Sequence, residues 1–215
     1  MMIDPEERKS QSIKLLQQLN VPVLDSLPVI EPTDEIRLRR PSDVARRLLC
    51  LMLVSDTARD ADPGDCINYL RKNSLFEDLS PAERDFIDSR NVTDQARNNL
   101  SWRCEAAYVL MWALGKFPDL PVPRSETDLD DIYVHMPPFD DDPRAFIETA
   151  TLIDKERIMD QSDLIYRMHW ATRPGRTEGS SASVLDGDVV QEWHQAINWL
   201  TFYADEDWDD VPTDT

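Results

Sequence analysis

The sequence predicts an all-α protein that folds as a single compact multi-helix domain. Helix-start signals recur along the chain, and no stretch shows the sustained apolar–polar alternation that is typical of a half-buried strand. The length of 215 residues favours one domain, and a hydrophobic content of 41% is enough to build a core. At most one short β element is expected.

The first helix is predicted from Pro5 to about Leu19. Asp4 precedes a proline at the first helical position, and an acid follows in the first turn, which is typical of a capped start. Residues 20–41 then contain four prolines, which exclude a continuous helix. We therefore expect an extended, proline-rich strap over residues 20–41, with residues 35–40 (EIRLRR) as the candidate short strand.

The next helix, which begins at Ser42, should be central because its segment 48–54 (LLCLMLV) is apolar on every side. Thr93 is expected to cap one long helix that reaches Leu114 and ends at Gly115. Similar signals predict helices at residues 67–72 and 80–90, from residues 142–143 onward, and at residues 154–172 and 187–203.

Three segments are expected to lack regular structure. Residues 117–128 are proline-rich, and residues 173–187 hold three of the five glycines, which predicts a mobile loop. Residues 204–215 form an acidic C-terminal segment around Trp208. A disordered acidic tail has little reason to keep an indole, so this segment is interpreted as a clasp that folds back onto the domain.

In this clasp, Trp208 is predicted to pack against the last two long helices. At least one of three aspartates should pair with an arginine; the aspartates are Asp209, Asp210 and Asp214. The cationic candidates are Arg103, Arg167, Arg173 and the RLRR segment of the strap. The alternative is a frayed terminus, which is the usual state of chain ends.

The net charge of −19 is concentrated in two stretches without Lys or Arg, residues 126–142 and 204–215. Such surfaces repel nucleic acid and anionic lipid, and they attract a basic protein partner or a cation. The alternative is plain solubility. The candidate partner-binding acids are Asp128, Asp130, Asp131, Asp140, Asp141, Asp142, Asp205, Glu206 and Asp207.

The location predicted from the sequence is cytoplasmic. The longest apolar stretches, residues 48–54 and 106–115, are far shorter than the ~20 residues that a membrane-spanning helix needs. The N-terminus carries charges at once and has no apolar signal region. The three cysteines, which have no C-x-x-C spacing, are expected to be buried free thiols: Cys50, Cys66 and Cys104.

Five ionisable residues at inward-facing helix positions are candidates for one polar pocket: Arg103, Glu105, Arg167, His169 and His194. Glu105 lies in an apolar helix, so we expect it to be buried and paired with an Arg or a His. The alternative is that all five are structural ion pairs and hydrogen bonds that tie helices together.

No metal and no cofactor are predicted. His169, His194 and Glu105 together would suit zinc or iron, but no H-x-x-x-H or E-x-x-H spacing enforces such a site. The sequence also lacks phosphate-loop, dinucleotide-binding and nucleophile-elbow motifs.

Four segments are distinctive in combination: SWRCEAAYVLMWALG (101–115), YRMHWATR (166–173), EWHQAINWL (192–200) and WDDVPTDT (208–215). With the N-terminal segment they make the chain, from Glu6 to Thr215, resemble a bacterial family known as domain of unknown function 4272. The resemblance implies a soluble helical protein and supplies no activity, cofactor or catalytic residue. The leading functional hypothesis is a non-enzymatic protein-binding module, such as a toxin-neutralising protein or an adaptor. The alternative is an enzyme with a buried Arg/Glu/His pocket, and the oligomeric state stays open.

Overall fold

Helices are the only regular elements in the residues that the structure, a computed structural model, describes, which are 3–89, 92–173 and 184–215. In chain order the elements are α1 (Pro5–Gln18), α2 (Pro41–Ala58), α3 (Pro63–Lys72), η1 (Phe76–Asp78), α4 (Pro81–Asp88), α5 (Asp94–Ser101), α6 (Arg103–Ala113), α7 (Leu129–Tyr133), α8 (Arg144–Glu148), α9 (Lys155–Thr172), α10 (Gly187–Leu200) and η2 (Tyr203–Asp205). The predicted all-α class is confirmed. No helix among the described residues is long and apolar enough to cross a membrane.

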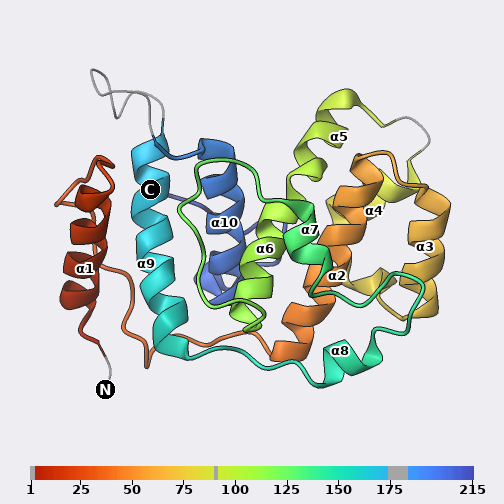
Figure 1. The fold of residues 1–215 in the computed structure, drawn as a ribbon, viewed down its shortest axis with the longest axis horizontal. Coiled ribbons are helices and arrows are strands. Elements are labelled where there is room, and N and C mark those ends of the chain that lie inside the picture. The colour runs from red at the N-terminus through yellow and green to blue at the C-terminus, as the bar shows by residue number, and fades with distance from the viewer. Residues whose placement is uncertain (1–2, 90–91, 174–183) are drawn as a thin grey trace.

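The long helices lie side by side in a row, as Figure 1 shows. The order in space is α1, α9, α10, α6 and α2, with α3, α4 and α5 at the far end. Helices α10 and α6 are therefore interior members of the row, with neighbours on both sides. This order places α9 and α10 next to each other.

Two apolar clusters hold the row together. The main cluster is centred on α2 and α6, where residues 48–52 are all 0% exposed. The smaller cluster joins α1, α9 and α10 to the strap and includes Leu16, Val21, Leu27 and Met168. Because strap residues belong to this cluster, the strap is a packed part of the fold. The three cysteines are free and buried, as expected.

The helix predicted from Thr93 to Leu114 is instead two helices, α5 and α6, that meet at Trp102. The Ser55 hydroxyl of α2 donates to the Ser101 carbonyl at 2.8 Å, and Arg59 donates to the same oxygen. The Glu105 N–H therefore bonds the Trp102 carbonyl, at 2.9 Å, in place of the regular partner four residues back. Side chains of α2 thus break the helix at a point that its own sequence does not mark.

The short strand proposed for residues 35–40 is wrong, since no strand occurs in the described part of the chain. The Arg39 N–H bonds the Leu200 carbonyl at the end of α10, at 3.0 Å, so the strap runs against a helix end. Helix α10 stops at Leu200 rather than at residue 203 because Phe202 and Ala204 have positive φ angles, 54° and 59°.

Smaller differences concern helix starts. The predicted capping box at Ser80 and Glu83 is present at α4. Helix α2 begins at Pro41, without a side-chain cap, rather than behind Ser42. The short helix α7 was not predicted. Of the loop predicted at 173–187, residues 174–183 lie outside the described residues.

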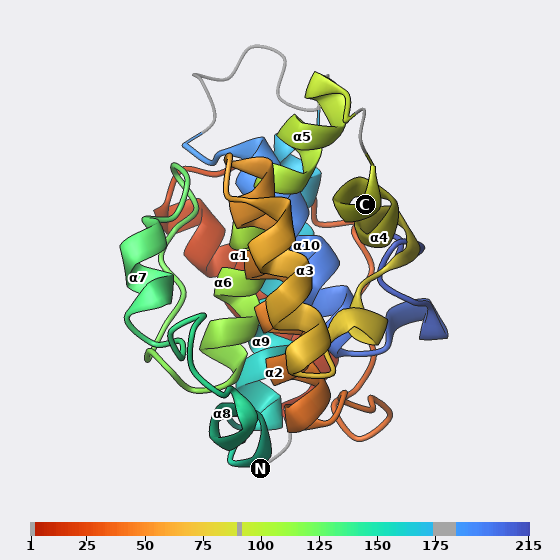
Figure 2. The same cartoon turned by 90° about the vertical axis from the view of Figure 1, so that its right-hand side faces the viewer.

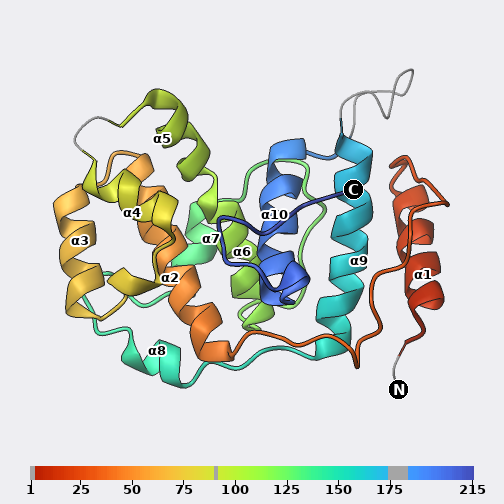
Figure 3. The ribbon, with the colours of Figure 1, turned by 180° about the vertical axis from the view of Figure 1, so that it is seen from behind.

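The C-terminal segment crosses α10 on the face of the molecule seen in Figure 3 and ends beside α9. Helix α7 lies on the other face, as the turned view in Figure 2 shows. The two acidic stretches of the sequence therefore occupy opposite faces of the row.

Candidate functional site

Three consecutive side chains of α10 point in three different directions and meet three different partners. Successive residues of a helix are rotated by about 100°, so Glu192, Trp193 and His194 cannot share a partner. All three are buried, at 9%, 1% and 3% exposure. Each contacts one of the residues that the sequence analysis proposed for a single pocket, and this rotation is the reason that those residues do not converge.

Glu105 is 0% exposed, so the burial that we predicted for it is confirmed. The partner that we predicted is wrong. The carboxylate accepts hydrogen bonds from the Thr127 N–H at 2.6 Å, the Thr127 hydroxyl at 2.8 Å and the Trp193 indole at 3.3 Å. No Arg, Lys or His pairs with it among the described residues. Burial raises the pKa of Glu105, against the opposing effect of these donors.

Arg103 pairs with Glu192, a residue that was not predicted to belong to the site. Its Nη1 donates to Glu192 Oε2 and to Gln195 Oε1, at 2.9 Å each. Burial raises the pKa of Glu192, and Arg103 opposes that shift. The guanidinium group also lies 5.8 Å from the centre of the Trp208 ring. Arg103 therefore joins α6, α10 and the C-terminal segment.

Arg167 makes a two-pronged ion pair with Asp163 on the same helix, at 2.9 and 2.8 Å, and both side chains are buried. It also donates to the Pro28 carbonyl at 3.1 Å. Arg167 thus fastens the strap to α9.

His169 and His194 meet, as their positions on the inner faces of α9 and α10 allow. Their Nδ1 atoms are 2.7 Å apart, and the rings cross at 80°. Burial, followed by the charge of Arg173, lowers the pKa of His169 to about 4. Burial, followed by the charges of His169 and Arg173, lowers the pKa of His194 to about 3. The pair is therefore uncharged at neutral pH.

Gln191 connects this pair to the C-terminal segment. It donates its amide N–H to the Thr213 hydroxyl at 2.8 Å, and its side chain raises the pKa of His169 against the larger effects of burial and Arg173. The short distance between the two Nδ1 atoms requires that one of them carries a proton and the other accepts it.

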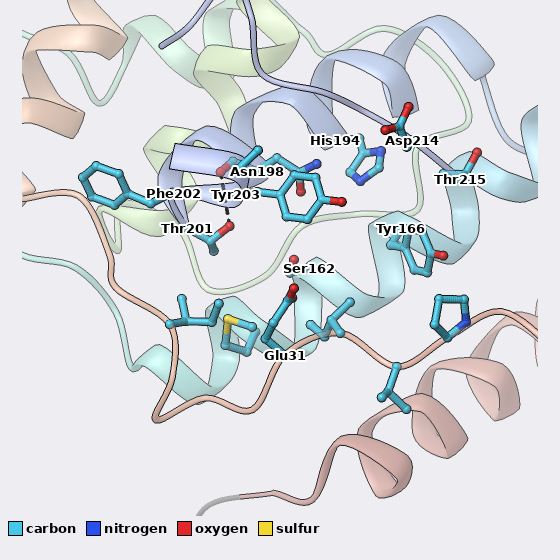
Figure 4. A pocket seen from close by; sticks show the side chains of 16 residues that line it. Glu31, Ser162, Tyr166, His194, Asn198, Thr201, Phe202, Tyr203, Asp214 and Thr215 are labelled. Carbon is cyan, nitrogen blue, oxygen red and sulfur yellow. Dashed lines mark hydrogen bonds between the residues drawn. The ribbon is translucent and has the colours of Figure 1, made fainter. Parts of the chain in front are cut away.

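His194 lines a pocket of about 630 Å³, hereafter the strap pocket. Figure 4 shows the ring of His194 in one wall with Asn198 and Asp214, opposite Glu31 of the strap and Ser162 of α9. The walls come from five segments: strap residues 28–31 and 36, α9 residues 159, 162 and 166, α10 residues 194 and 198, turn residues 201–204, and residues 214–215.

The C-terminal segment forms part of this pocket because a stripe of α10 amides holds it. Gln191, Gln195 and Asn198 follow helical spacing on one face. Gln195 donates to the Trp208 carbonyl and Asn198 donates to the Pro212 carbonyl, both at 2.9 Å. Arg173 donates to the Thr213 carbonyl, also at 2.9 Å. The segment is thereby fixed from residue 208 to the pocket wall.

Trp208 is 3% exposed, as the clasp interpretation expects. It packs edge-on against Trp199 of α10, with ring centres 5.5 Å apart, and under the guanidinium group of Arg47 of α2, at 4.4 Å. It therefore packs between α10 and α2 rather than between the last two long helices. The predicted aspartate–arginine pairing is wrong for Asp209, Asp210 and Asp214 among the described residues. Asp209 instead accepts from the Ala82 N–H at 2.9 Å.

The candidate acidic residues are all exposed, but the two stretches differ. In the second stretch, Asp205 pairs with Arg37 of the strap at 2.9 Å, so part of the charge is matched. Burial lowers the pKa of Arg39, and the charges of Asp207 and Asp205 oppose that shift. In the first stretch, Glu126 lies 3.5 Å from Arg59 and Asp142 lies 3.7 Å from Arg144, whereas the acids at 128–131 have no ion pair among the described residues. Val134, in the same stretch, is 74% exposed.

No group of three or more His, Cys, Asp or Glu residues in the described ranges could hold a metal ion. The residues that line the strap pocket were mostly not found from the sequence. Glu31 lies in a segment interpreted only as a strap, and Ser162 and Asn198 are common helix residues. The Asp163–Arg167 pair could have been found, because its spacing of four residues is a standard helix ion-pair signal.

The fold and the site together define an all-α domain with a pocket that is lined by the strap, α9, α10 and the C-terminal segment. The chain belongs to the family described as Domain of unknown function (DUF4272), whose model matches residues 8–211. Searches of curated proteins and of solved structures each found no match to the chain.

Proposed function

We propose that the chain is a non-enzymatic binding protein that takes up a small organic molecule in the strap pocket. The observation that carries this proposal is the ring of His194, which is 3% exposed yet forms part of the pocket wall beside Asn198 and Asp214. A polar side chain that is held by its neighbours in a pocket wall offers a fixed hydrogen-bonding group to a ligand.

The size and lining of the pocket support the same proposal. Its volume of about 630 Å³ lies within the range of roughly 300–1,000 Å³ that is usual for small-molecule sites. Apolar strap residues, including Val29 and Ile30, face polar groups from α9 and α10. This combination of an apolar wall and a few convergent polar groups is typical of ligand sites.

An enzyme built on the five residues predicted from the sequence has less support. Catalytic groups must lie within hydrogen-bond reach of one another or of a shared substrate. Arg103 and Glu105 have partners away from the pocket lining, and Arg167 is held by Asp163 and by the Pro28 carbonyl. Only His194 of the five lines the strap pocket.

The test compares the native chain with a variant whose pocket is filled. Ser162 projects into the pocket and makes no hydrogen bond among the described residues, so Ser162→Phe adds volume there without breaking a bond. Ser10→Phe, on the exposed side of α1, is the matched control. Each protein is incubated with the small-molecule fraction of a cell extract, desalted and denatured, and the released compounds are measured by mass spectrometry.

We expect compounds that are enriched by the native chain and by Ser10→Phe and are lost with Ser162→Phe. Equal enrichment by all three folded proteins, or none by any of them, would refute the proposal. Circular dichroism and thermal unfolding establish that Ser162→Phe is folded before the comparison is made.

A second function, docking of a basic protein partner, is favoured by one observation on the opposite face. Val134 is 74% exposed and Tyr133 is 37% exposed within the acidic stretch 126–142. An exposed apolar pair inside a charged rim has the composition of a protein-binding surface. A toxin-neutralising protein or an adaptor would present such a surface.

Two variants separate this function from simple solubility. Val134→Ser removes the apolar centre without changing charge, and Asp130→Asn with Asp131→Asn reduces the charge of the rim. If a basic partner docks here, a partner recovered by the native chain at low salt is lost at high salt, because exposed charge attraction is screened. It is also weakened by both variants. A partner that both variants retain fully would contradict docking at this surface.

A further inference from the structure

A second pocket lies between α1, α9 and residues 119–122, with Trp112 of α6 in its wall. Helices α1 and α9 are neighbours at one end of the row (Figure 1), and no residue of the described chain lines both this pocket and the strap pocket. We propose that this second pocket, hereafter the α1 pocket, binds a neutral small molecule that carries a carbonyl oxygen on an apolar body. Because the two pockets are separate, this inference does not depend on the function proposed above.

Two buried N–H groups of the lining residues have no acceptor among the described residues. They are Nη1 of Arg8 and the indole Nε1 of Trp112, and these two residues are 1% and 2% exposed. Buried donors in proteins are almost always paired, because an unpaired donor has lost its water without gaining a partner. A ligand that supplies an acceptor atom is therefore favoured at this site.

The neighbours of Arg8 hold its guanidinium group so that Nη1 cannot turn to another partner. Nε donates to Asp160 at 2.8 Å, and Nη2 donates to Glu156 at 2.6 Å and to the Thr33 hydroxyl at 2.8 Å. Because the guanidinium group is planar and rigid, these three bonds fix the position of Nη1 as well. The position of the free donor is thus set before a ligand arrives.

The charged residues of the lining are already paired, so they do not select an ion. They are two arginines and two aspartates: Arg8, Arg157, Asp119 and Asp160. Arg8 pairs with Asp160 and also with Glu156, and Arg157 pairs with Asp119 at 3.2 Å. With Glu156 included, the group carries one surplus negative charge, which opposes an anionic ligand. A cationic ligand would bring further donors and leave both free N–H groups without an acceptor.

The remaining wall is mostly apolar, which favours an apolar body. Leu15, Leu164 and Met168 belong to it, and Leu15 is 41% exposed, so a bound ligand would remove its apolar surface from water. The volume of about 360 Å³ lies at the lower end of the range of roughly 300–1,000 Å³ that is usual for small-molecule sites. Because the two free N–H groups are buried, the carbonyl oxygen must displace part of the lining, and the long side chains of Gln11 and Gln161 can turn aside as the ligand binds.

Three probes of the same shape test these requirements: acetophenone, α-methylstyrene and benzoate. Each has a phenyl ring, a planar branched group and the same number of non-hydrogen atoms. Acetophenone has a neutral carbonyl oxygen, α-methylstyrene replaces this oxygen by CH₂, and benzoate replaces the methyl group by a charged oxygen. Binding is measured by ¹H–¹⁵N NMR of the indole N–H groups of the chain, which has 6 tryptophans.

We expect acetophenone to bind about tenfold more tightly than α-methylstyrene, which is the effect of one buried hydrogen bond. Acetophenone should also bind more tightly than benzoate, because benzoate meets the surplus negative charge of the lining. The indole N–H resonance of Trp112 should move downfield as acetophenone binds, since this group gains an acceptor.

Matched variants locate the binding. Trp112→Phe removes the unpaired N–H, keeps an aromatic ring and identifies the Trp112 resonance, and Trp102→Phe makes the same change outside the lining. We expect Trp112→Phe to weaken acetophenone about tenfold and α-methylstyrene less than about twofold. Trp102→Phe should change neither by more than about twofold. Trp112→Phe breaks no hydrogen bond of the indole group within the described chain, so the variant should fold.

Three results with the native chain alone would each overturn the inference: equal binding of acetophenone and α-methylstyrene, tighter binding of benzoate, or no binding of any probe at millimolar concentration. A Trp112 resonance that stays fixed while acetophenone binds would do the same. Ser162→Phe, which fills the strap pocket, should bind acetophenone as the native chain does. Loss of acetophenone binding in Ser162→Phe would place the probe in the strap pocket and refute the α1 pocket as its site.

Discussion

The carboxylate of Asp209 accepts a hydrogen bond from the backbone N–H of Ala82 at 2.9 Å, so the C-terminal segment caps helix α4 from 127 positions away in the sequence. The first backbone N–H groups of a helix have no partner within the helix, and a carboxylate there is favoured by the helix dipole. With the burial of Trp208 on Trp199, this contact makes the segment part of the folded domain.

Removal of residues 208–215 should therefore destabilise the protein. The deletion removes a buried indole, the α4 cap and the contacts to Gln191, Gln195 and Asn198. We expect the midpoint of thermal unfolding to fall by several degrees, since ~1 kcal/mol corresponds to ~2–4 °C for a domain of this size. An unchanged midpoint would show that the segment is loose.

Single substitutions distinguish the effect of the capping residue Asp209 from that of its neighbour Asp210. Asp209→Ala should lower the free energy of unfolding by about 1 kcal/mol, the usual effect of losing a helix cap. Asp210→Ala, at the next exposed position, should change it by less than about 0.5 kcal/mol. Chemical denaturation measures both, and equal effects would argue against capping by Asp209.

Glu105→Ala should lower the free energy of unfolding by about 3 kcal/mol, because three buried donors lose their acceptor: the Thr127 N–H, the Thr127 hydroxyl and the Trp193 indole. Glu105→Gln keeps one acceptor oxygen and should lower the free energy less. A loss below about 0.5 kcal/mol for Glu105→Ala would mean that the site is effectively exposed.

Breaking the Asp163–Arg167 pair should be strongly destabilising. Arg167→Met leaves Asp163 charged and 0% exposed, with an expected loss of about 3–5 kcal/mol. Asp163→Ala combined with Arg167→Met should recover part of that loss, since no buried charge then stays unpaired. If the double variant is as unstable as the sum of the single variants, the pair is not a coupled unit.

The histidine pair predicts a loss of stability in mild acid. The pKa values of His169 and His194 are lowered to about 4 and about 3 in the folded chain, whereas an unfolded histidine titrates near ~6.5. The unfolded state therefore binds protons first, so the free energy of unfolding should fall as the pH drops from ~6.5 towards ~4. Each histidine should contribute on the order of 1 kcal/mol of this loss per pH unit.

Glu105 and Glu192 have the opposite effect on the pH dependence of stability. Because burial raises their pKa values, the folded state binds protons before the unfolded state does, and this favours folding as the pH falls towards the ordinary range of a carboxyl group. Replacing His169 and His194 together by Gln therefore isolates the histidine contribution. The variant should lose less stability than the native chain between pH 6.5 and 4. Identical pH profiles would show that the pair does not resist protonation.

Much of the fold could be predicted because its signals are local. The proline and cap at Ser80, the apolar segment 48–54 and the Asp154 cap each set an element from a few neighbouring residues. The break at Trp102 could not be predicted, since it depends on Ser55 and Arg59 reaching across from α2.

The same distinction applies to the site. Burial of Glu105 and the inward positions of His169 and His194 follow from helical periodicity. Their partners do not, because Thr127 approaches from a loop and the rotation of α10 decides which residue meets which. The pocket itself is assembled by the strap and the C-terminal segment, whose paths are fixed by tertiary contacts such as Arg167 to Pro28.

The most direct test of the central claim, that the strap pocket is a ligand site, is ¹⁵N NMR of the ring nitrogens in the chain, which has only 3 histidines. The small-molecule fraction of a cell extract is added at rising concentration to the native chain and to Ser162→Phe. We predict that the ring nitrogen resonances of His194 shift and that the shift saturates, and that Ser162→Phe shows no change. Resonances of His194 that stay fixed while compounds are retained, or that move equally in Ser162→Phe, would contradict the claim.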